Sequence, residues 1–247
     1  MKSLHTQLFS IFFCDKEHCF KRSQFDHLQN SQELLRQSQF QFLASSNLKA
    51  LIVAHQVHKT NGVIINSLDQ ALAYRPYSVA ADFLVTHIPN IGIGVATADC
   101  LPIIFYDIKN HAVGIAHAGW QGTVNNITYK VIESMQENFG TQVQDMQIFF
   151  GPCASVENYE VSADFGEKIT YGQLKKQISE KTFIQKNNKH YFNLPLYNQL
   201  LLEAIGIQKS ALNWDFFECT MSNKNFCSYR RDKNEQRQIT IVFLKNS

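Results

Sequence analysis

Closely spaced apolar runs between residues 81 and 120 constrain the fold of this chain more than any other feature. The runs read ADFLVTH, IGIGVATADCLPIIFYD and AVGIAHAGW, and only short polar turns separate them. Each run has the length and composition of one or two buried strands. A doubly wound parallel sheet needs a helical crossover between successive strands, and these turns are too short for one. The pattern therefore favours an α+β or mixed α/β fold.

Helical periodicity appears on both sides of these strands. The segments that carry it are residues 26–47, 122–140, 161–183 and 192–207. The last of them has the strongest signal, because Pro195 stands in its first turn and Gly206 at its end. Upstream of the apolar runs, residues 48–65 read as strand, turn, strand, with Asn61-Gly62 as the turn.

Length and composition favour a single folded domain over residues 1–247. Hydrophobic residues make up 45% of the sequence, enough for a packed core, and charged residues make up only 18%, which argues against disorder. The net charge of +2 gives no electrostatic basis for binding nucleic acid or an anionic membrane. The apolar stretch Leu8–Phe13 is too short for a secretory core region or a membrane span. We therefore expect a cytoplasmic protein without a nucleic-acid or membrane partner.

Six cysteines are present, and no two of them form a CxxC pair. A chain of 247 residues does not need disulfides in order to fold. For five of the six we predict reduced, mostly buried thiols that pack as small hydrophobic residues. These are Cys14, Cys19, Cys153, Cys219 and Cys227. Cys100 differs from them because of its neighbours.

Cys100 and His117 each end an apolar, strand-like run, and His58 follows a third run, ALIVAHQVH. A sheet holds such residues rigidly while their side chains emerge at its edge. Two imidazoles and a thiolate can bind zinc with one open position, and they also suit copper. Without a metal, a cysteine beside a histidine can act as nucleophile and base. His55 lies three positions before His58, so a strand would direct it to the other face, in the core or at the surface.

Three more polar residues have two interpretations each. Asp99 either caps the turn at residues 101–102 or orients a metal-bound histidine. Arg230 and Arg231 are followed by Asp232, which predicts either an internal salt bridge or a guanidinium that binds a substrate phosphate or carboxylate. Adjacent strand residues point in opposite directions, so only one of the two arginines would reach a site.

Six segments of the chain, in this order, resemble the YfiH family, whose members are also called laccase-domain or multicopper polyphenol oxidase proteins. The segments are QVHKTNGV, ADFLVT, TADCLPIIFYD, VGIAHAGWQGTV, GPCASVENYEV and FCSYRRD, and the resemblance covers roughly residues 48–243. It implies a single α+β domain of layered mixed β-sheets flanked by helices, similar in outline to the catalytic domain of cytotoxic necrotizing factors. Residues 1–47 diverge, since they lack the glycine-rich segment common in the family.

The resemblance also implies a function and a cofactor. In this family the histidine of QVH, the cysteine of ADC and the histidine of HAGW form the zinc-binding catalytic site, and they match His58, Cys100 and His117. The implied reactions are phosphorolysis of adenosine, inosine and methylthioadenosine, and deamination of adenosine. The implied partners are therefore a purine nucleoside and phosphate, bound by a monomer or weak oligomer.

Phosphate binding is the point at which this sequence departs from the family. Members usually carry Arg or Lys after the tryptophan of HAGW, whereas this chain has Gln121, which carries no charge. If that position contacts phosphate, Arg230 or Arg231 would have to supply the positive charge. The candidate substrate-binding residues are therefore Asp99, Gln121, Arg230 and Arg231.

Two other enzyme classes fit part of the pattern. A copper-dependent polyphenol oxidase needs several histidine-rich clusters, but the nine histidines are scattered and include no HxH pair, so zinc is preferred to copper. A metal-free cysteine hydrolase would use Cys100 as nucleophile and His117 as base, and the family has been linked to the editing of a peptidoglycan precursor.

Overall fold

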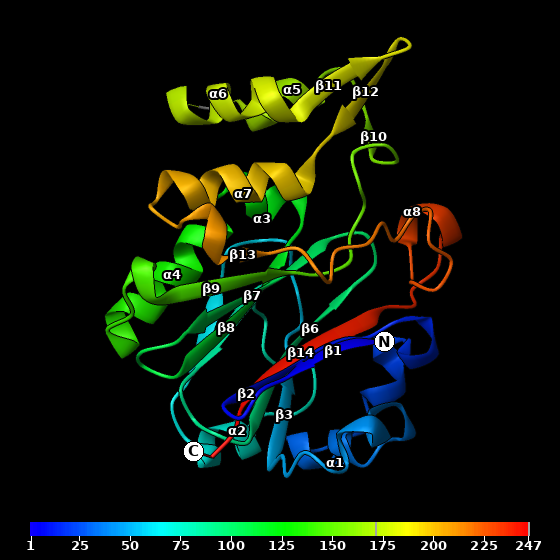
Figure 1. Cartoon of the computed structure of the whole chain (residues 1–247). Helices are drawn as coiled ribbons and strands as arrows, with labels where there is room; N and C mark the ends of the chain where they lie inside the picture. Colours follow the sequence, from blue (N-terminus) through cyan, green and yellow to red (C-terminus); the bar gives the residue numbers. More distant parts are fainter. Residues whose placement is uncertain (171, 247) are drawn as a thin grey trace.

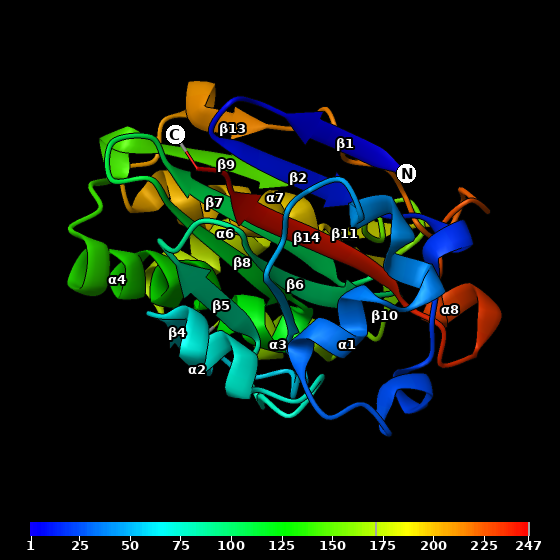
Figure 2. The same ribbon diagram turned by 90° about the horizontal axis from the view of Figure 1, so that it is seen from below.

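Two β-sheets stacked face to face form the centre of the computed structural model, which describes residues 1–170 and 172–246 (Figures 1 and 2). One sheet has six strands in the order β13-β9-β7-β8-β5-β4, and the other has five in the order β1-β2-β14-β6-β3. The strands of the six-stranded sheet are β4 (Gly62–Ile65), β5 (Phe83–Thr86), β7 (Leu101–Asp107), β8 (Ala112–Ala118), β9 (Met146–Phe150) and β13 (Leu212–Asn213). Those of the five-stranded sheet are β1 (Lys2–His5), β2 (Phe9–Phe13), β3 (Ala50–Val53), β6 (Ile91–Thr97) and β14 (Gln238–Leu244).

Helices cover the outer faces of the two sheets. The α-helices are α1 (Ser31–Leu35), α2 (Leu68–Ala73), α3 (Trp120–Val124), α4 (Ile127–Phe139), α5 (Phe165–Ile169), α6 (Gln173–Thr182), α7 (Leu194–Ala204) and α8 (Tyr229–Asp232). Short 3-10 helices span Lys16–His18, Arg22–Phe25, Ser38–Leu43, Val143–Asp145 and Lys209–Ala211. Helices α4 and α7 lie on the six-stranded sheet, and the N-terminal segment lies on the five-stranded one (Figure 1).

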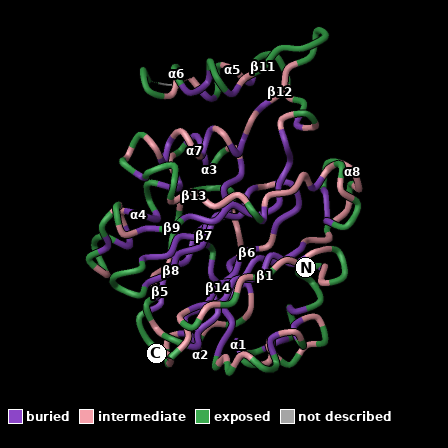
Figure 3. Tube along the Cα trace, in the orientation of Figure 1, coloured by how far each residue is buried: buried purple, intermediate pink, exposed green. Residues whose placement is uncertain are grey.

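Strand β7 shows how side-chain alternation builds two of the three core layers. Ile103 and Phe105 point to the helices, whereas Ile104 and Tyr106 point to the five-stranded sheet. All of these residues are buried, and buried residues are concentrated in the central strands of both sheets (Figure 3). The expected fold class, a single domain of layered mixed sheets flanked by helices, is confirmed. Within the described ranges, no helix has the length and apolar character that crossing a membrane requires.

The third core layer packs the N-terminal segment against the five-stranded sheet. Phe20, Phe25, Phe40 and Tyr77 are all buried there, with ring centroids 5.2 to 6.1 Å apart. Burying a large aromatic side chain contributes about 1.5–3 kcal/mol, so this cluster fixes an otherwise polar segment. The single helix predicted over residues 26–47 is wrong, because extended backbone at Gln37 separates α1 from the 3-10 helix that follows.

The helix predicted over residues 122–140 is also interrupted. Asn126 adopts a left-handed conformation with φ of 63°, which ends α3 and starts α4 on a new axis. Asparagine tolerates this region better than most residues. Gly140, with φ of 70°, ends α4 where the sequence predicts. The strands predicted within residues 48–65 exist, but they lie in different sheets, because β3 pairs with β6 and β4 pairs with β5.

Helices α5 and α6 form an outer arm with a small three-stranded sheet, β10 (Glu160–Val161), β12 (Lys189–Phe192) and β11 (Phe183–Lys186) (Figure 1). This arm agrees with the helical prediction for residues 161–183, of which Tyr171 lies outside the described residues. It packs on α7 through Phe165, Ile178 and Phe192.

A disulfide joins Cys19 to Cys227, and the prediction that both are reduced is therefore wrong. The two cysteines are 208 positions apart, so local sequence gives no hint of the pairing. Backbone hydrogen bonds between Phe20 and Arg237 bring the two segments together. Cys14, Cys100, Cys153 and Cys219 carry thiols.

Candidate metal centre

His58, Cys100 and His117 converge at one end of the stacked sheets. Cys100 stands between β6 and β7, His117 lies on β8 directly opposite Pro102 of β7, and His58 belongs to the loop between β3 and β4. Their candidate ligand atoms all lie within 4.8 Å of one another. The rings of His58 and His117 are nearly perpendicular, with centroids 4.8 Å apart. His117 is buried, Cys100 is half-buried and His58 is exposed. One side of the group is therefore open to an incoming molecule.

A buried carboxylate, Asp82, organises two of these residues. Its Oδ1 accepts hydrogen bonds from the backbone N–H of His58 at 2.9 Å and from Nδ1 of His117 at 2.9 Å. Its Oδ2 accepts from the N–H groups of Lys59 at 2.8 Å and Val57 at 3.3 Å. The bond to His117 leaves Nε2 as the ring nitrogen available for a metal.

The same bonds hold a strained part of the backbone. His58 has φ of 59°, in the left-handed region that residues with a Cβ seldom adopt. Burial alone would raise the pKa of Asp82, but the hydrogen bonds from His117 and the backbone lower it below its ordinary value. Sequence reasoning missed Asp82, although its position at the head of the apolar run DFLVT was a signal, because a carboxylate next to a buried strand needs donors.

Charges within the group favour an ionised thiol. Burial alone would raise the pKa of Cys100, but the positive charge of His117 and hydrogen bonds from both histidines lower it to about 6. Burial would lower the pKa of His117, but the Cys100 sulfur and Asp82 raise it to about 9. The group thus contains a thiolate, which is the form of cysteine that binds metals or attacks electrophiles.

Gly119, the glycine of HAGW, lies where a side chain would crowd the metal-binding group. A Cβ at this position would lie 3.1 Å from the Cys100 sulfur, 3.6 Å from His58 and 3.7 Å from His117. A methyl group would therefore crowd the Cys100 sulfur and make ordinary van der Waals contact with the two imidazoles. Two imidazoles, one thiolate and this uncrowded position fit a metal ion, and His58, Cys100 and His117 can hold one.

The four candidate substrate-binding residues lie around this group but not in it. Asp99 is buried with φ of 86°, and its carboxylate accepts from Thr220 Oγ1 and from the Arg230 backbone N–H, both at 2.7 Å. Neither a bond to the turn at residues 101–102 nor one to a histidine is found for this carboxylate within the described residues. Asp99 instead anchors the loop that precedes α8.

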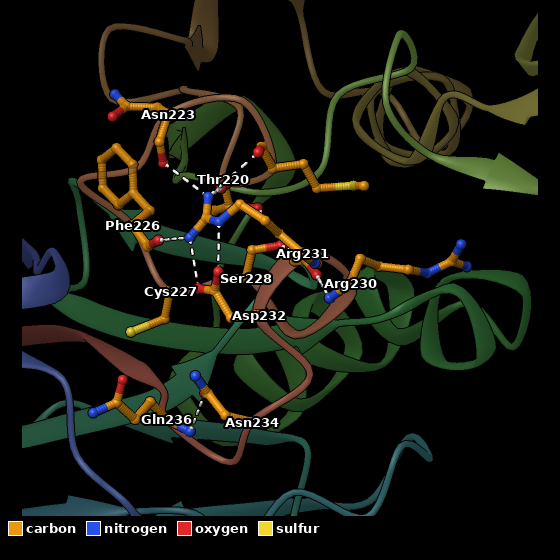
Figure 4. Close-up of polar contacts among 12 residues, drawn as sticks. Thr220, Asn223, Phe226, Cys227, Ser228, Arg230, Arg231, Asp232, Asn234 and Gln236 are labelled. Atoms are coloured by element: carbon orange, nitrogen blue, oxygen red, sulfur yellow. Dashed lines mark hydrogen bonds and ion pairs between the residues drawn. The ribbon is translucent and has the colours of Figure 1, made fainter.

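Arg231 is enclosed by that loop (Figure 4). Its guanidinium donates two bonds of 2.7 Å to Asp232 and one of 2.7 Å to each of the carbonyls of Thr220 and Phe226. The sequence left two interpretations of this arginine, an internal salt bridge or a contact with substrate. The structure shows the internal salt bridge, and backbone carbonyls add further bonds to it. Its N–H groups are therefore engaged in holding the loop.

Arg230 and Gln121 are both exposed. The Arg230 guanidinium lies 4.9 Å from the centre of the Tyr159 ring and donates to the Glu160 carbonyl at 2.7 Å. Gln121 lies in α3, one residue beyond Trp120. In the described part of the chain, none of the four candidates lines the pocket beside the metal-binding group.

That pocket has a volume of about 730 Å³, enough for a molecule of nucleoside size. Its walls come from six segments: the N-terminal segment, the loop after β3, the segment between α2 and β5, the end of β6 with the turn after it, β8, and the stretch from α8 to β14. The lining residues are Phe20, Arg22, Ser23, Asp26, His55, Gln56, His58, Tyr77, Ala96, Thr97, Ala98, Cys100, His117, Tyr229, Glu235 and Arg237. The divergent N-terminal segment therefore supplies a pocket wall. His55 lies in this wall, half-buried, and not on a separate face as the strand spacing predicted.

Comparison with known families identifies the fold. The model of the family described as multi-copper polyphenol oxidoreductase laccase matches residues 21–245. The chain belongs to this family. It is also similar to the crystal structure of the Bacillus licheniformis hypothetical protein YfiH, with 29% identity, a TM-score of 0.71, and coverage of 79% of this chain and 74% of that one. The resemblance inferred from the sequence motifs is thus confirmed.

Two curated relatives carry names that describe activities. A purine nucleoside phosphorylase from Staphylococcus saprophyticus is 30% identical over 191 residues, covering 76% of this chain and 70% of the relative. Adenosine deaminase RL5, from an unknown prokaryotic organism, is 29% identical over 206 residues, covering 81% of this chain and 77% of the relative.

Proposed function

We propose that this chain is a zinc-dependent purine nucleoside enzyme that catalyses phosphorolysis of adenosine, inosine and methylthioadenosine, and deamination of adenosine, in the cytoplasm. The observation that carries the proposal is the group of His58, Cys100 and His117 beside a pocket of about 730 Å³. The names of the two curated relatives support it.

Each residue of the group would provide one ligand to zinc. His58 and His117 would each offer a ring nitrogen, and Cys100 would offer its sulfur. Bound there, zinc would supply a Lewis acid with one open coordination position. Asp82 keeps His117 in the tautomer that leaves Nε2 available, and Gly119 leaves the space beside Cys100 clear.

The two reactions make different demands on the pocket. Deamination adds the oxygen of a water molecule to C6 of adenine and releases the amino group as ammonia. Phosphorolysis forms a bond from a phosphate oxygen to C1′ of the ribose as the bond from C1′ to N9 breaks, and the base leaves with a proton. The ring of Tyr229 in the wall, which is 51% exposed, offers a flat apolar surface for a purine. The second reaction also needs cationic groups for phosphate.

The test is to incubate purified protein with each nucleoside, with and without phosphate, and to separate the products by chromatography. Free base that forms only with phosphate, and inosine that forms from adenosine, are the expected products. His58→Gln should abolish both. His111→Gln is a matched control, since His111 is also exposed with a positive φ of 49° but lies at the opposite end of β8. Absence of both products from zinc-loaded wild-type protein would refute the proposal.

Metal analysis separates this proposal from a copper oxidase. In the described residues, one group of three potential ligands is found, whereas a multicopper site needs several. About one zinc per chain is therefore expected. Several coppers per chain, together with oxidation of phenols, would favour the oxidase.

A metal-free cysteine hydrolase is a second candidate, and one observation favours it. The pKa of the Cys100 thiol is about 6 and that of its partner His117 is about 9, so the pair is a thiolate beside an imidazolium near neutral pH. This is the charge state of a nucleophile and its acid. Its substrate would be a peptidoglycan precursor. Hydrolysis of such a precursor by chelator-treated protein, and its loss in Cys100→Ser, would support this candidate over the first.

A further inference from the structure

The pocket beside the metal-binding group is lined by two arginines without acidic partners. Arg22 and Arg237 both line the pocket, and the paired backbones of Phe20 and Arg237 hold them on the same wall. Among the ion pairs of residues 1–170 and 172–246, none includes either arginine. The exposed carboxylates Asp26 and Glu235 also line the pocket, but they bond to neither.

The side chains of both arginines are positioned by neutral groups. Nη1 of Arg22 lies 2.5 Å from Nε2 of His55, which is half-buried in the same wall. Nη1 of Arg237 donates to the carbonyls of Asn234 at 3.0 Å and Gln236 at 2.9 Å, and its guanidinium lies 5.4 Å from the centre of the Tyr229 ring. These contacts leave both guanidinium groups without a bonded carboxylate and most of their N–H groups available.

Buried hydroxyl groups complete this wall. Tyr77 is only 4% exposed and Thr97 only 1%, and neither hydroxyl has a hydrogen-bond partner among the described residues. Buried polar groups are nearly always bonded, and leaving one unpaired is costly. Tyr77 also has φ of 58°, a conformation that is unfavourable for an aromatic residue. Burial raises the pKa of Tyr77, and the positive charge of Arg22 opposes the rise.

We propose that Arg22, His55, Tyr77 and Arg237 form a binding subsite for inorganic phosphate. Guanidinium, imidazole and phenol groups are strong donors to phosphate oxygens, and two arginines balance the charge of a phosphate dianion. The inference rests on the proposed function, for which it supplies the second substrate. It also explains why the uncharged Gln121 is compatible with phosphate binding. The cations lie on the N-terminal wall and in the loop after α8 instead of following HAGW.

The first experiment measures binding of inorganic phosphate by calorimetry, without nucleoside, to wild-type protein, Arg22→Gln and Lys21→Gln. Lys21 is a matched control, since it is the adjacent exposed cation but does not line the pocket. Loss of a charged hydrogen-bond donor should weaken phosphate binding on the order of tenfold or more in Arg22→Gln. Lys21→Gln should change it less than about twofold, since surface charges at a distance are screened. Equal affinity in wild-type protein and Arg22→Gln would overturn the proposal.

Tyr77→Phe gives a second measurement that a purely structural role would not produce. It removes one buried hydroxyl without a partner, so the melting temperature in phosphate-free buffer should be unchanged or higher. Phosphate affinity should nevertheless fall several-fold, on the order expected for one lost hydrogen bond. A lower melting temperature with unchanged phosphate affinity would count against the subsite.

Kinetics separate this subsite from the proposed function. If Arg22→Gln loses phosphate binding but wild-type protein turns over no nucleoside, the subsite stands and the proposed function fails. If wild-type protein performs phosphorolysis and Arg22→Gln keeps the same KM for phosphate, the subsite fails and the function stands. A site that binds adenosine monophosphate through Arg22 but not inorganic phosphate would overturn the assignment to inorganic phosphate.

Discussion

Asp82→Asn should weaken both the fold and metal binding, by amounts that follow from the hydrogen bonds of this carboxylate. Each of its oxygens accepts two bonds from donors that are buried or part-buried. Asparagine keeps one oxygen and replaces the other with an NH2 group, which cannot accept. Two N–H donors therefore lose their partner, whichever way the amide is turned.

The cost can be worked out from these two orphaned donors. Each buried donor without a partner costs about 1–3 kcal/mol, so the free energy of unfolding should fall by about 2–5 kcal/mol. For a chain of this size 1 kcal/mol corresponds to about 2–4 °C, which predicts a fall in melting temperature of about 5–15 °C. Loss of the carboxylate behind His117 should also reduce zinc affinity about 10–100-fold.

Thermal unfolding of metal-free protein and competition for zinc with a chromogenic chelator measure the two effects separately. Asp107→Asn is the matched control, because Asp107 is also fully buried and accepts bonds from Lys109 and Asn110, but at the far end of β7. That variant should lose stability while keeping zinc affinity. If Asp82→Asn bound zinc as tightly as Asp107→Asn does, the role assigned to Asp82 would be refuted.

Three further predictions concern the same end of the molecule. Gly119→Ala should lower zinc affinity severalfold because its Cβ would lie 3.1 Å from the Cys100 sulfur, and the chelator assay measures this; unchanged affinity would contradict the crowding argument. In metal-free protein, the thiolate of Cys100 should persist down to a pH of about 6. Alkylation of the Cys100 peptide by iodoacetamide should therefore reach half its maximal rate near pH 6. A midpoint near 9.0, the ordinary pKa of a cysteine thiol, would be inconsistent with the charge from His117. Reduction of the Cys19–Cys227 disulfide removes a constraint on a 208-residue separation and should lower the unfolding free energy by about 2–5 kcal/mol, measured in denaturant with and without reductant; coincident curves would contradict it.

Residues at strand ends were the predictable part of the site. His58, Cys100 and His117 each follow an apolar run. Their function could be predicted because a thiol and two imidazoles together fit only a few kinds of site. The structure brings them within 4.8 Å through pairing of β7 with β8 and of β5 with β8. Local hydrophobic patterns specify the strands, and the short turn between β7 and β8 makes these two neighbours, whereas the short turn between β6 and β7 joins strands of different sheets.

The supporting residues were much harder to predict. Asp82 accepts bonds from four donors, three of which belong to the loop at residues 57–59, and nothing in its immediate sequence defines that loop. The breaks at Gln37 and Asn126 likewise depend on packing against the sheets, which overrides helical periodicity. The Cys19–Cys227 pair depends on the contact between the two ends of the chain.

The metal-binding group and the rest of the pocket are built from different parts of the chain, and this has a consequence for specificity. His58, Cys100 and His117 are held by strands and by Asp82, whereas Arg22 and Arg237 belong to segments that contact each other through Phe20 and the disulfide. Figure 1 shows the N-terminal segment in blue beside the red loop after α8. Substitutions in these two segments can therefore change which molecule enters the pocket without moving a metal ligand. We therefore expect substitutions in the N-terminal wall to change substrate preference while metal affinity stays the same.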